Sequence, residues 1–153
     1  MIIRQLLSGA AAGAAGTTAL NAATYLDMAG RGRPESETPK KTAEELADRA
    51  HVDIPGDEDA AGNRASALGA LSGIVTGVGV GAAYGLARGL GVRMPLWAGV
   101  LATSAGALVG SNGPMTALGV ADPREWSTVD WISDVVPHLA YGLVTAATYE
   151  ATS

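Results

Sequence analysis

The feature that most constrains this sequence is the segregation of its charges. Residues 5–26, 65–87 and 94–121, stretches of 22, 23 and 28 residues, contain no charged side chain, and neither does the 15-residue stretch 135–149. Ten of the fifteen acidic and six of the ten basic residues lie between Asp27 and Arg64. A helix of roughly 20 apolar residues crosses a bilayer core of about 30 Å. Three stretches are therefore long enough to span a membrane, and the fourth is long enough if its span runs from Trp131 to Tyr149.

Composition excludes several other classes of protein. Hydrophobic residues make up 48% and charged residues 16% of the chain, which excludes intrinsic disorder. The absence of cysteine excludes a disulfide scaffold and thiol chemistry. The net charge of -5, without a basic stripe, argues against nucleic acid as a partner. A soluble bundle with alanine-rich contacts is the alternative to a membrane protein, but its helices should each show a polar face. Residues 67–87 show none, which favours the membrane.

The pattern predicts an all-α fold, a four-helix transmembrane bundle in one domain over residues 1–153. Helices are expected at about 3–26, 64–90, 94–111 and 128–150, with a polar loop over 27–63. The first helix is rich in alanine and glycine and is a poor signal peptide, so it is predicted to span. Within the loop, Thr42 and Glu45 predict a capping box and a short helix over about 42–50. Ser111-Asn-Gly-Pro114 is expected to end the third helix, and Ser127 with Asp130 to cap the fourth.

Glycine recurs at every fourth position of the second predicted helix. Residues four apart lie on nearly one face of a helix, so these glycines form a groove that a neighbouring backbone can enter. Small residues mark helix interfaces in membranes. The third and first helices carry companion stripes. The predicted packing residues are Gly69, Gly73, Gly77, Gly81, Gly85 and Gly89, with Gly106, Gly110, Gly9 and Gly13. The groove serves either packing within the chain or a homo-oligomer.

This register resembles the glycine zippers of multi-pass bacterial membrane proteins, some mechanosensitive channels among them. The resemblance covers about 21 residues and implies tight helix packing, not a channel. The chain as a whole resembles short uncharacterised multi-pass membrane proteins of GC-rich actinobacteria. That second resemblance implies no activity.

Polar residues of the predicted spans gather at the end nearest the long loop. On the fourth helix Asp130, Asp134 and His138 are spaced by four and share a face, with Pro137 beside them. Three interpretations stay open: polar groups in the headgroup zone, a proton or cation site, or a metal site if Asp27 converges with Asp134 and His138. No metal or cofactor is predicted. The opposite end is expected to carry interfacial aromatic residues, Tyr84, Trp97 and Tyr149. The residues of the candidate ion or proton site are Asp134, His138, Tyr141, Asn21, Asp27 and Asn112.

Lysine and arginine counts predict the orientation. Seven lie on the side of the long loop and three on the other, which favours a cytoplasmic loop 27–63 in a bacterial plasma membrane.

No nucleophile, phosphate-loop or metalloprotease motif is present, so the chain is predicted not to be an enzyme. The predicted function is a structural or accessory role in a homo-oligomer or larger membrane complex, surrounded by lipid. The alternative is a small channel or transporter subunit with a proton or cation site near Asp134 and His138.

Overall fold

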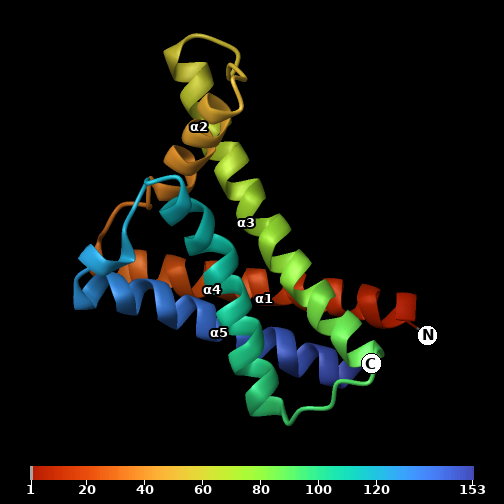
Figure 1. Ribbon diagram of the computed structural model, residues 1–153. Coiled ribbons are helices and arrows are strands. Elements are labelled where there is room, and N and C mark those ends of the chain that lie inside the picture. Colours follow the sequence, from red (N-terminus) through yellow and green to blue (C-terminus); the bar gives the residue numbers. More distant parts are fainter. Residues whose placement is uncertain (1) are drawn as a thin grey trace.

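The computed structural model describes residues 2–153, and over this range all the regular structure is helical, as predicted. There are five α-helices and one short 3-10 helix, one α-helix more than the number of predicted spans because the loop helix is also formed (Figure 1). In chain order they are α1 (Ile2–Arg31), α2 (Thr38–Arg49), α3 (Glu58–Gly89), α4 (Leu96–Ala117), η1 (Pro123–Glu125) and α5 (Thr128–Thr152).

The helices are arranged as two antiparallel pairs that cross obliquely. α1 and α5 lie side by side, with the start of α1 next to the end of α5, where the Tyr149 hydroxyl donates a hydrogen bond to Gln5 Oε1 at 2.5 Å. α3 and α4 cross this pair, and α2 packs against the first half of α3 to form a hairpin that projects from the bundle (Figure 1). Arg49 of α2 donates to the Leu118 carbonyl after α4, at 2.8 Å, and so ties the hairpin to the bundle.

Two helix starts carry side-chain caps, and the cap of α5 is the one predicted from the sequence. The Asp57 carboxylate accepts a hydrogen bond from the Ala60 amide at 2.9 Å, and two acidic residues follow in the first turn of α3, where the helix dipole favours negative charge. At α5, Ser127 and Asp130 form a reciprocal capping box. The predicted cap of the last helix is therefore confirmed.

Four predicted helix boundaries are wrong. α1 continues to Arg31 instead of ending near residue 26, and α3 begins at Glu58 instead of near residue 64.

The other two errors lie in α2 and α4. α2 begins at Thr38, with Pro39 in its first turn, so Thr42 lies inside the helix and donates to the Thr38 carbonyl instead of capping. Proline is well tolerated at a helix start because its missing amide would have no partner there. α4 continues through Ser111-Asn-Gly-Pro114 to Ala117. A proline within a helix removes one backbone hydrogen bond, which here does not end the helix.

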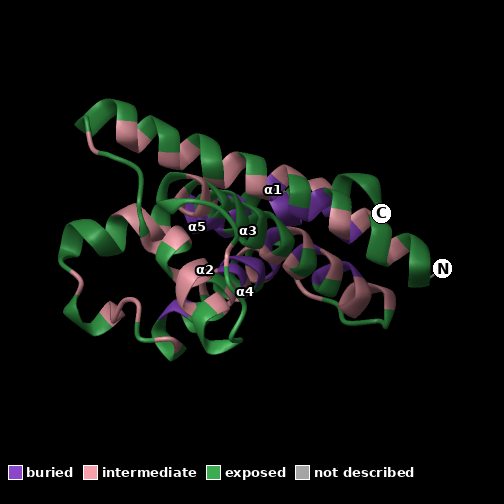
Figure 2. Ribbon diagram, turned by 90° about the horizontal axis from the view of Figure 1, so that it is seen from above, coloured by how far each residue is buried: buried purple, intermediate pink, exposed green. Residues whose placement is uncertain are grey.

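The interior contains small, hydroxyl-bearing and aromatic residues instead of branched aliphatic ones. Over residues 2–153, no leucine, isoleucine or valine is buried. The most exposed aliphatic side chains include Ile3 at 75%, Leu26 at 74% and Val109 at 71%. Figure 2 shows the buried positions where the long helices meet and exposed surface elsewhere. The buried side chains beyond glycine and proline are Ala12, Ala65, Tyr84, Thr103, Ser104, Ala107, Met115, His138, Tyr141, Thr145, Ala146 and Tyr149.

Glycines bring the backbones of α1 and α3 into direct contact. A Cβ atom added to Gly81 would lie 2.5 Å from the Gly13 Cα and 2.7 Å from its nitrogen, and one added to Gly85 would lie 2.9 Å from the Gly9 Cα. Gly77, the next glycine along the groove, faces Thr17 of α1 and Tyr141 of α5. The first helix of the same chain therefore fills this part of the groove.

The remaining predicted packing glycines have varied neighbours. Gly69 faces the backbone of Pro39 in α2, Gly89 faces Gln5, and Gly106 and Gly110 of α4 face side chains of α3. Gly73 has open space around it, so it is the one predicted packing glycine without a neighbour in the described chain. Close contacts that the sequence analysis missed lie at Gly16, Gly99 and Gly142, which face side chains of neighbouring helices.

Of the helices in residues 2–153, only α3 is long and apolar enough to cross a membrane by length and composition. Only 22% of its most apolar part is buried, unlike the core helix of a soluble protein. α1 and α4 are interrupted by glycine, serine, threonine and asparagine, which keep each of them below the hydropathy of α3's most apolar part. One apolar helix gives weak support for a membrane location. The number of spans stays a prediction.

Candidate functional site

Four polar side chains meet between the end of α4 and the first half of α5. We call Ser111, Asn112, Asp134 and His138 the polar seam. Asn112 Nδ2 donates to Asp134 Oδ2 at 2.8 Å, and Ser111 Oγ lies 3.1 Å from His138 Nε2. The His138 side chain is buried, that of Asp134 is 20% exposed and Ser111 is exposed, so the seam is open at both Ser111 and Asp134. Because α4 continues past Ser111, it carries Ser111 and Asn112, two of the four residues of the polar seam, into contact with α5.

The imidazole of His138 is held from both sides. Its Nδ1 lies 2.7 Å from the backbone carbonyl of Asp134 and 3.4 Å from Oδ1 of the same residue. A carbonyl oxygen only accepts hydrogen bonds, so Nδ1 is the protonated nitrogen. Nε2 is then free to accept a hydrogen bond from the Ser111 hydroxyl in the neutral ring.

Serine, histidine and aspartate thus stand in the order of a hydrolase triad, which the sequence analysis did not foresee. The contacts differ from that chemistry in two respects. The Ser111 hydroxyl has a shorter contact, 2.9 Å, to the Ala107 carbonyl of its own helix. The Asn112 amide, the neighbouring side-chain donor, is already bound to Asp134 and is not directed at an oxyanion position beside Ser111. In this structure Ser111 and Asn112 are thus engaged by the Ala107 carbonyl and by Asp134.

The other three predicted site residues lie outside the polar seam. Tyr141 is fully buried and its hydroxyl donates to the Gly77 carbonyl at 2.6 Å, which links α5 to α3. Asn21 is exposed on α1. Asp27 is bound by two arginines, Arg31 at 2.5 Å and Arg33 at 2.6 Å. The structure therefore brings together Asn112, Asp134 and His138.

The Asp27 cluster joins α1 to α5 beside the polar seam. Hydrogen bonds from Arg31 and Arg33 lower the pKa of Asp27 from 3.8 to about 2. Arg31 also donates to the Ser133 hydroxyl of α5 at 2.5 Å. The convergence of Asp27 with Asp134 and His138 on a metal is not formed. Within residues 2–153 no group of three or more His, Asp or Glu side chains could hold a metal ion.

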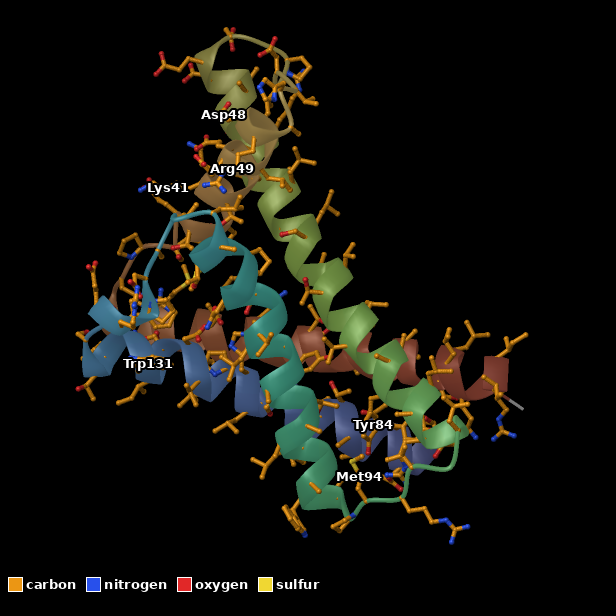
Figure 3. The ribbon with its side chains drawn as sticks, viewed as in Figure 1. Lys41, Asp48, Arg49, Tyr84, Met94 and Trp131 are labelled. Carbon is orange, nitrogen blue, oxygen red and sulfur yellow. The ribbon has the colours of Figure 1, made fainter. Side chains whose placement is uncertain are left out.

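A second polar cluster, at the opposite end of the bundle, was not predicted. Arg88 forms an ion pair with Glu150 at 2.6 Å, and its guanidinium lies 5.7 Å from the ring centre of Tyr84 and 5.8 Å from that of Tyr149. Figure 3 shows Tyr84 near Met94, whose carbonyl accepts a hydrogen bond from Arg88 at 3.3 Å. The cluster ties the end of α3 to the end of α5 and to the following loop.

This cluster corrects the predicted belt of interfacial aromatic residues. Tyr84 is 6% and Tyr149 2% exposed, and the two rings pack edge to face with centres 5.2 Å apart. Only Trp97, at 67% exposure, lies on the surface as expected. The spacing of Tyr84 and Arg88 by four residues, next to a glycine-rich turn, is the one signal in the sequence that could have indicated the cluster.

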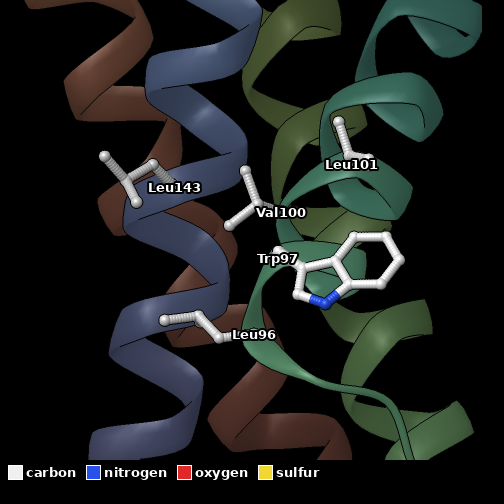
Figure 4. A pocket seen from close by; sticks show the side chains of 5 residues that line it. All are labelled: Leu96, Trp97, Val100, Leu101 and Leu143. Atoms are coloured by element: carbon white, nitrogen blue, oxygen red, sulfur yellow. The ribbon is translucent and has the colours of Figure 1, made fainter.

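An apolar groove lies on the surface between the first half of α4 and the second half of α5. The residues that line it are all apolar: Leu96, Trp97, Val100, Leu101 and Leu143 (Figure 4). With no polar group to orient a ligand, the groove lacks the specificity of a small-molecule site. It belongs to the exposed apolar surface that surrounds the bundle.

Comparison with protein-family models, with curated proteins and with solved structures gives no match to this chain. The proposals below therefore stand on the residues and contacts described above.

Proposed function

We propose that this chain is an integral membrane protein with a structural or accessory role, built as a compact bundle of tightly packed helices. The observation that carries the proposal is the partition of side chains. Over residues 2–153 no leucine, isoleucine or valine side chain is buried and most are exposed, whereas glycine, alanine, serine and threonine fill most helix contacts. A protein in water places its branched aliphatic residues inside, because their burial drives folding. A protein in lipid gains nothing from that arrangement and packs small residues instead.

The long charge-free helices support a multi-pass arrangement in a bacterial plasma membrane. Four helices, α1, α3, α4 and α5, then cross the bilayer, and the α2–α3 hairpin projects from it with the acidic loop. The excess of lysine and arginine on the hairpin side favours the cytoplasm for this loop. The chain has no cysteine, so single cysteines introduced at Glu44, Arg93 or Arg124 give unambiguous labels. An impermeant maleimide should label positions 44 and 124 from one side of the membrane and position 93 from the other.

The glycine groove supports a role in packing more than in catalysis or transport. α1 fills the groove of α3 at Gly77, Gly81 and Gly85, so these glycines assemble the chain itself. Gly73 has no neighbour within 4 Å of its added Cβ, so a short part of the glycine groove is free to contact another molecule. We propose that self-association or attachment to a larger membrane complex uses this open part and the exposed aliphatic faces. Leucine at position 73 then dissociates a homo-oligomer, whereas leucine at position 81 disrupts the fold.

Extraction and mass measurement test the proposal. The full chain is expressed in bacteria, the membranes are washed in alkaline carbonate, and the protein is released with mild detergent for light scattering. We expect the protein in the washed membranes and a discrete mass after extraction. Gly73→Leu shows whether the open glycine lies between copies. The variant should stay folded, and the mass of its particle in detergent should fall below that of the wild type only if copies associate through Gly73. A folded protein in the aqueous fraction contradicts the proposed membrane location.

A further inference from the structure

The neutral form of His138 is fixed in one tautomer by its own helix. Nδ1 donates to the Asp134 carbonyl at 2.7 Å, a contact formed within one turn of α5. Pro137 precedes His138 and is buried with it, so the ring sits at a fixed point of the helix next to α4. The second nitrogen, Nε2, points at Ser111 and is the position where a proton can be gained or lost.

The Ser111 hydroxyl can satisfy Nε2 in both protonation states. Its oxygen lies 3.1 Å from Nε2 and 2.9 Å from the Ala107 carbonyl. When the ring is neutral, the hydroxyl donates to Nε2. When the ring is charged, Nε2–H donates to the hydroxyl oxygen, and the hydroxyl turns to donate to Ala107. Rotation of one hydroxyl thus preserves the hydrogen bonds of the ring when a proton binds.

Asp134 is the charged group closest to the ring. On α5 the nearest titratable groups are Asp134, 3.4 Å from Nδ1, and Asp130 one turn earlier. α4 has no charged residue between Leu96 and Ala117, and α3 has none between Arg64 and Arg88. Arg31 and Asp27 of α1 form an ion pair with each other, and Arg31 contacts α5 at Ser133. The charged side chain of α2 that reaches α4, Arg49, contacts the carbonyl that follows that helix. The Asp134 carboxylate is therefore the unneutralised charge next to the ring.

We propose that the polar seam is a reversible proton-binding site, in which His138 takes up a proton at Nε2 against Ser111 while the Asp134 carboxylate balances the new charge. Ser111, which faces Nε2, is exposed, and Asp134 is 20% exposed, so the site is accessible from outside the bundle. The ligand is the proton itself, and the site needs no further cofactor. This inference goes beyond a packing role and does not depend on the number of membrane spans.

Nitrogen NMR of the full chain in detergent micelles tests the proposal. The protein contains two histidines, so a His51→Gln variant labelled with ¹⁵N-histidine reports on His138 alone. We expect neutral ring signals with the proton on Nδ1 at about pH 9 and doubly protonated ring signals at about pH 5, interconverting reversibly. Ring signals that stay the same across this range in folded protein would overturn the proposal. A neutral ring protonated on Nε2 would also overturn it.

A serine substitution separates a proton site from a buried histidine of purely structural role. Ser111→Ala removes the acceptor for Nε2–H, and hydrogen bonds from charged donors are stronger than those between neutral groups. We therefore expect its transition at lower pH than in the parent. Ser72→Ala is the matched control, because the Ser72 hydroxyl also bonds a carbonyl of its own helix but lies on α3 away from the ring. An equal transition in Ser111→Ala and in the control would contradict the role of Ser111. If Ser111→Ala does not fold, the tautomer of His138 and the pH dependence of its ring signals in the parent protein still test the proposal.

Discussion

Replacing Gly81 with alanine tests the closest helix contact in the molecule. The added methyl group would lie 2.5 Å from the Gly13 Cα and 2.7 Å from the Gly13 nitrogen, and it would also meet the Gly9 carbonyl. All three atoms belong to the backbone of α1, so no side chain can turn away to make room. The methyl group fits only if α1 and α3 move apart, which loosens the contact along the whole groove.

Gly73→Ala is the matched control for the size of this effect. Gly73 lies on the same helix and has open space around it. Both substitutions gain the same helix propensity, about 0.5–1 kcal/mol, so this contribution cancels between them. The difference in free energy of unfolding is then the cost of overpacking, about 1–3 kcal/mol. Because the clash is with backbone, we expect the upper end, which corresponds to roughly 6–12 °C in melting temperature for a chain of this size.

Thermal unfolding of the two variants in the same detergent, followed by circular dichroism, measures the difference. The structure predicts that Gly73→Ala melts at or above the wild-type temperature and Gly81→Ala well below it. Equal melting temperatures for the two variants would refute the packing of α1 in the groove of α3.

Three further predictions concern polar contacts. Tyr141→Phe removes the buried hydrogen bond from α5 to the α3 carbonyl and should cost about 1 kcal/mol in unfolding free energy, whereas the same change at exposed Tyr25 should cost nothing measurable. The pKa of Asp27 is lowered by its arginine partners to about 2, so its ion pairs stabilise the fold fully above about pH 4 and this stability is lost as the pH falls toward 2. Asp27→Asn should abolish that part of the pH dependence of the melting temperature, and an unchanged acid profile would contradict the pairing. Arg88→Gln should lower the unfolding free energy by about 1–3 kcal/mol because it breaks the Glu150 ion pair. Arg124→Gln, at an exposed pair, should have little effect in the same denaturation assay.

Local chemistry made much of the helical structure predictable. The charge-free stretches located the four long helices, and Ser127 with Asp130 marked the start of the last one. Asp57 caps α3 at Glu58, before the predicted start near residue 64. The boundaries that failed have different causes. Pro114 lies inside α4 because the helix beyond Ser111 packs its polar side chains against α5. Thr42 fits the capping pattern, but Pro39 starts the helix one turn earlier.

Spacing along one helix predicted only part of the candidate site. Asp134 and His138 were identified because they are four residues apart on the same helix face. The antiparallel path of the helices placed Ser111 and Asn112 at the same level, but the contact of Ser111 with Nε2 follows only from the packing of α4 on α5. Asp27 was considered as a metal ligand because it is a carboxylate, but its ion pairs with Arg31 and Arg33 neutralise its charge. The Arg88 cluster joins α3, the loop at Met94 and α5, so the spacing of Tyr84 and Arg88 within one helix indicated only part of it.

Fractionation of cells that express the full chain tests whether the exposed aliphatic surface of this bundle faces lipid. We expect the protein to remain in membranes washed with alkaline carbonate and to enter solution only with detergent. A folded protein in the carbonate or aqueous fraction, stable without detergent, would contradict it. In that case the small-residue contacts would describe a soluble bundle with an unusually apolar surface.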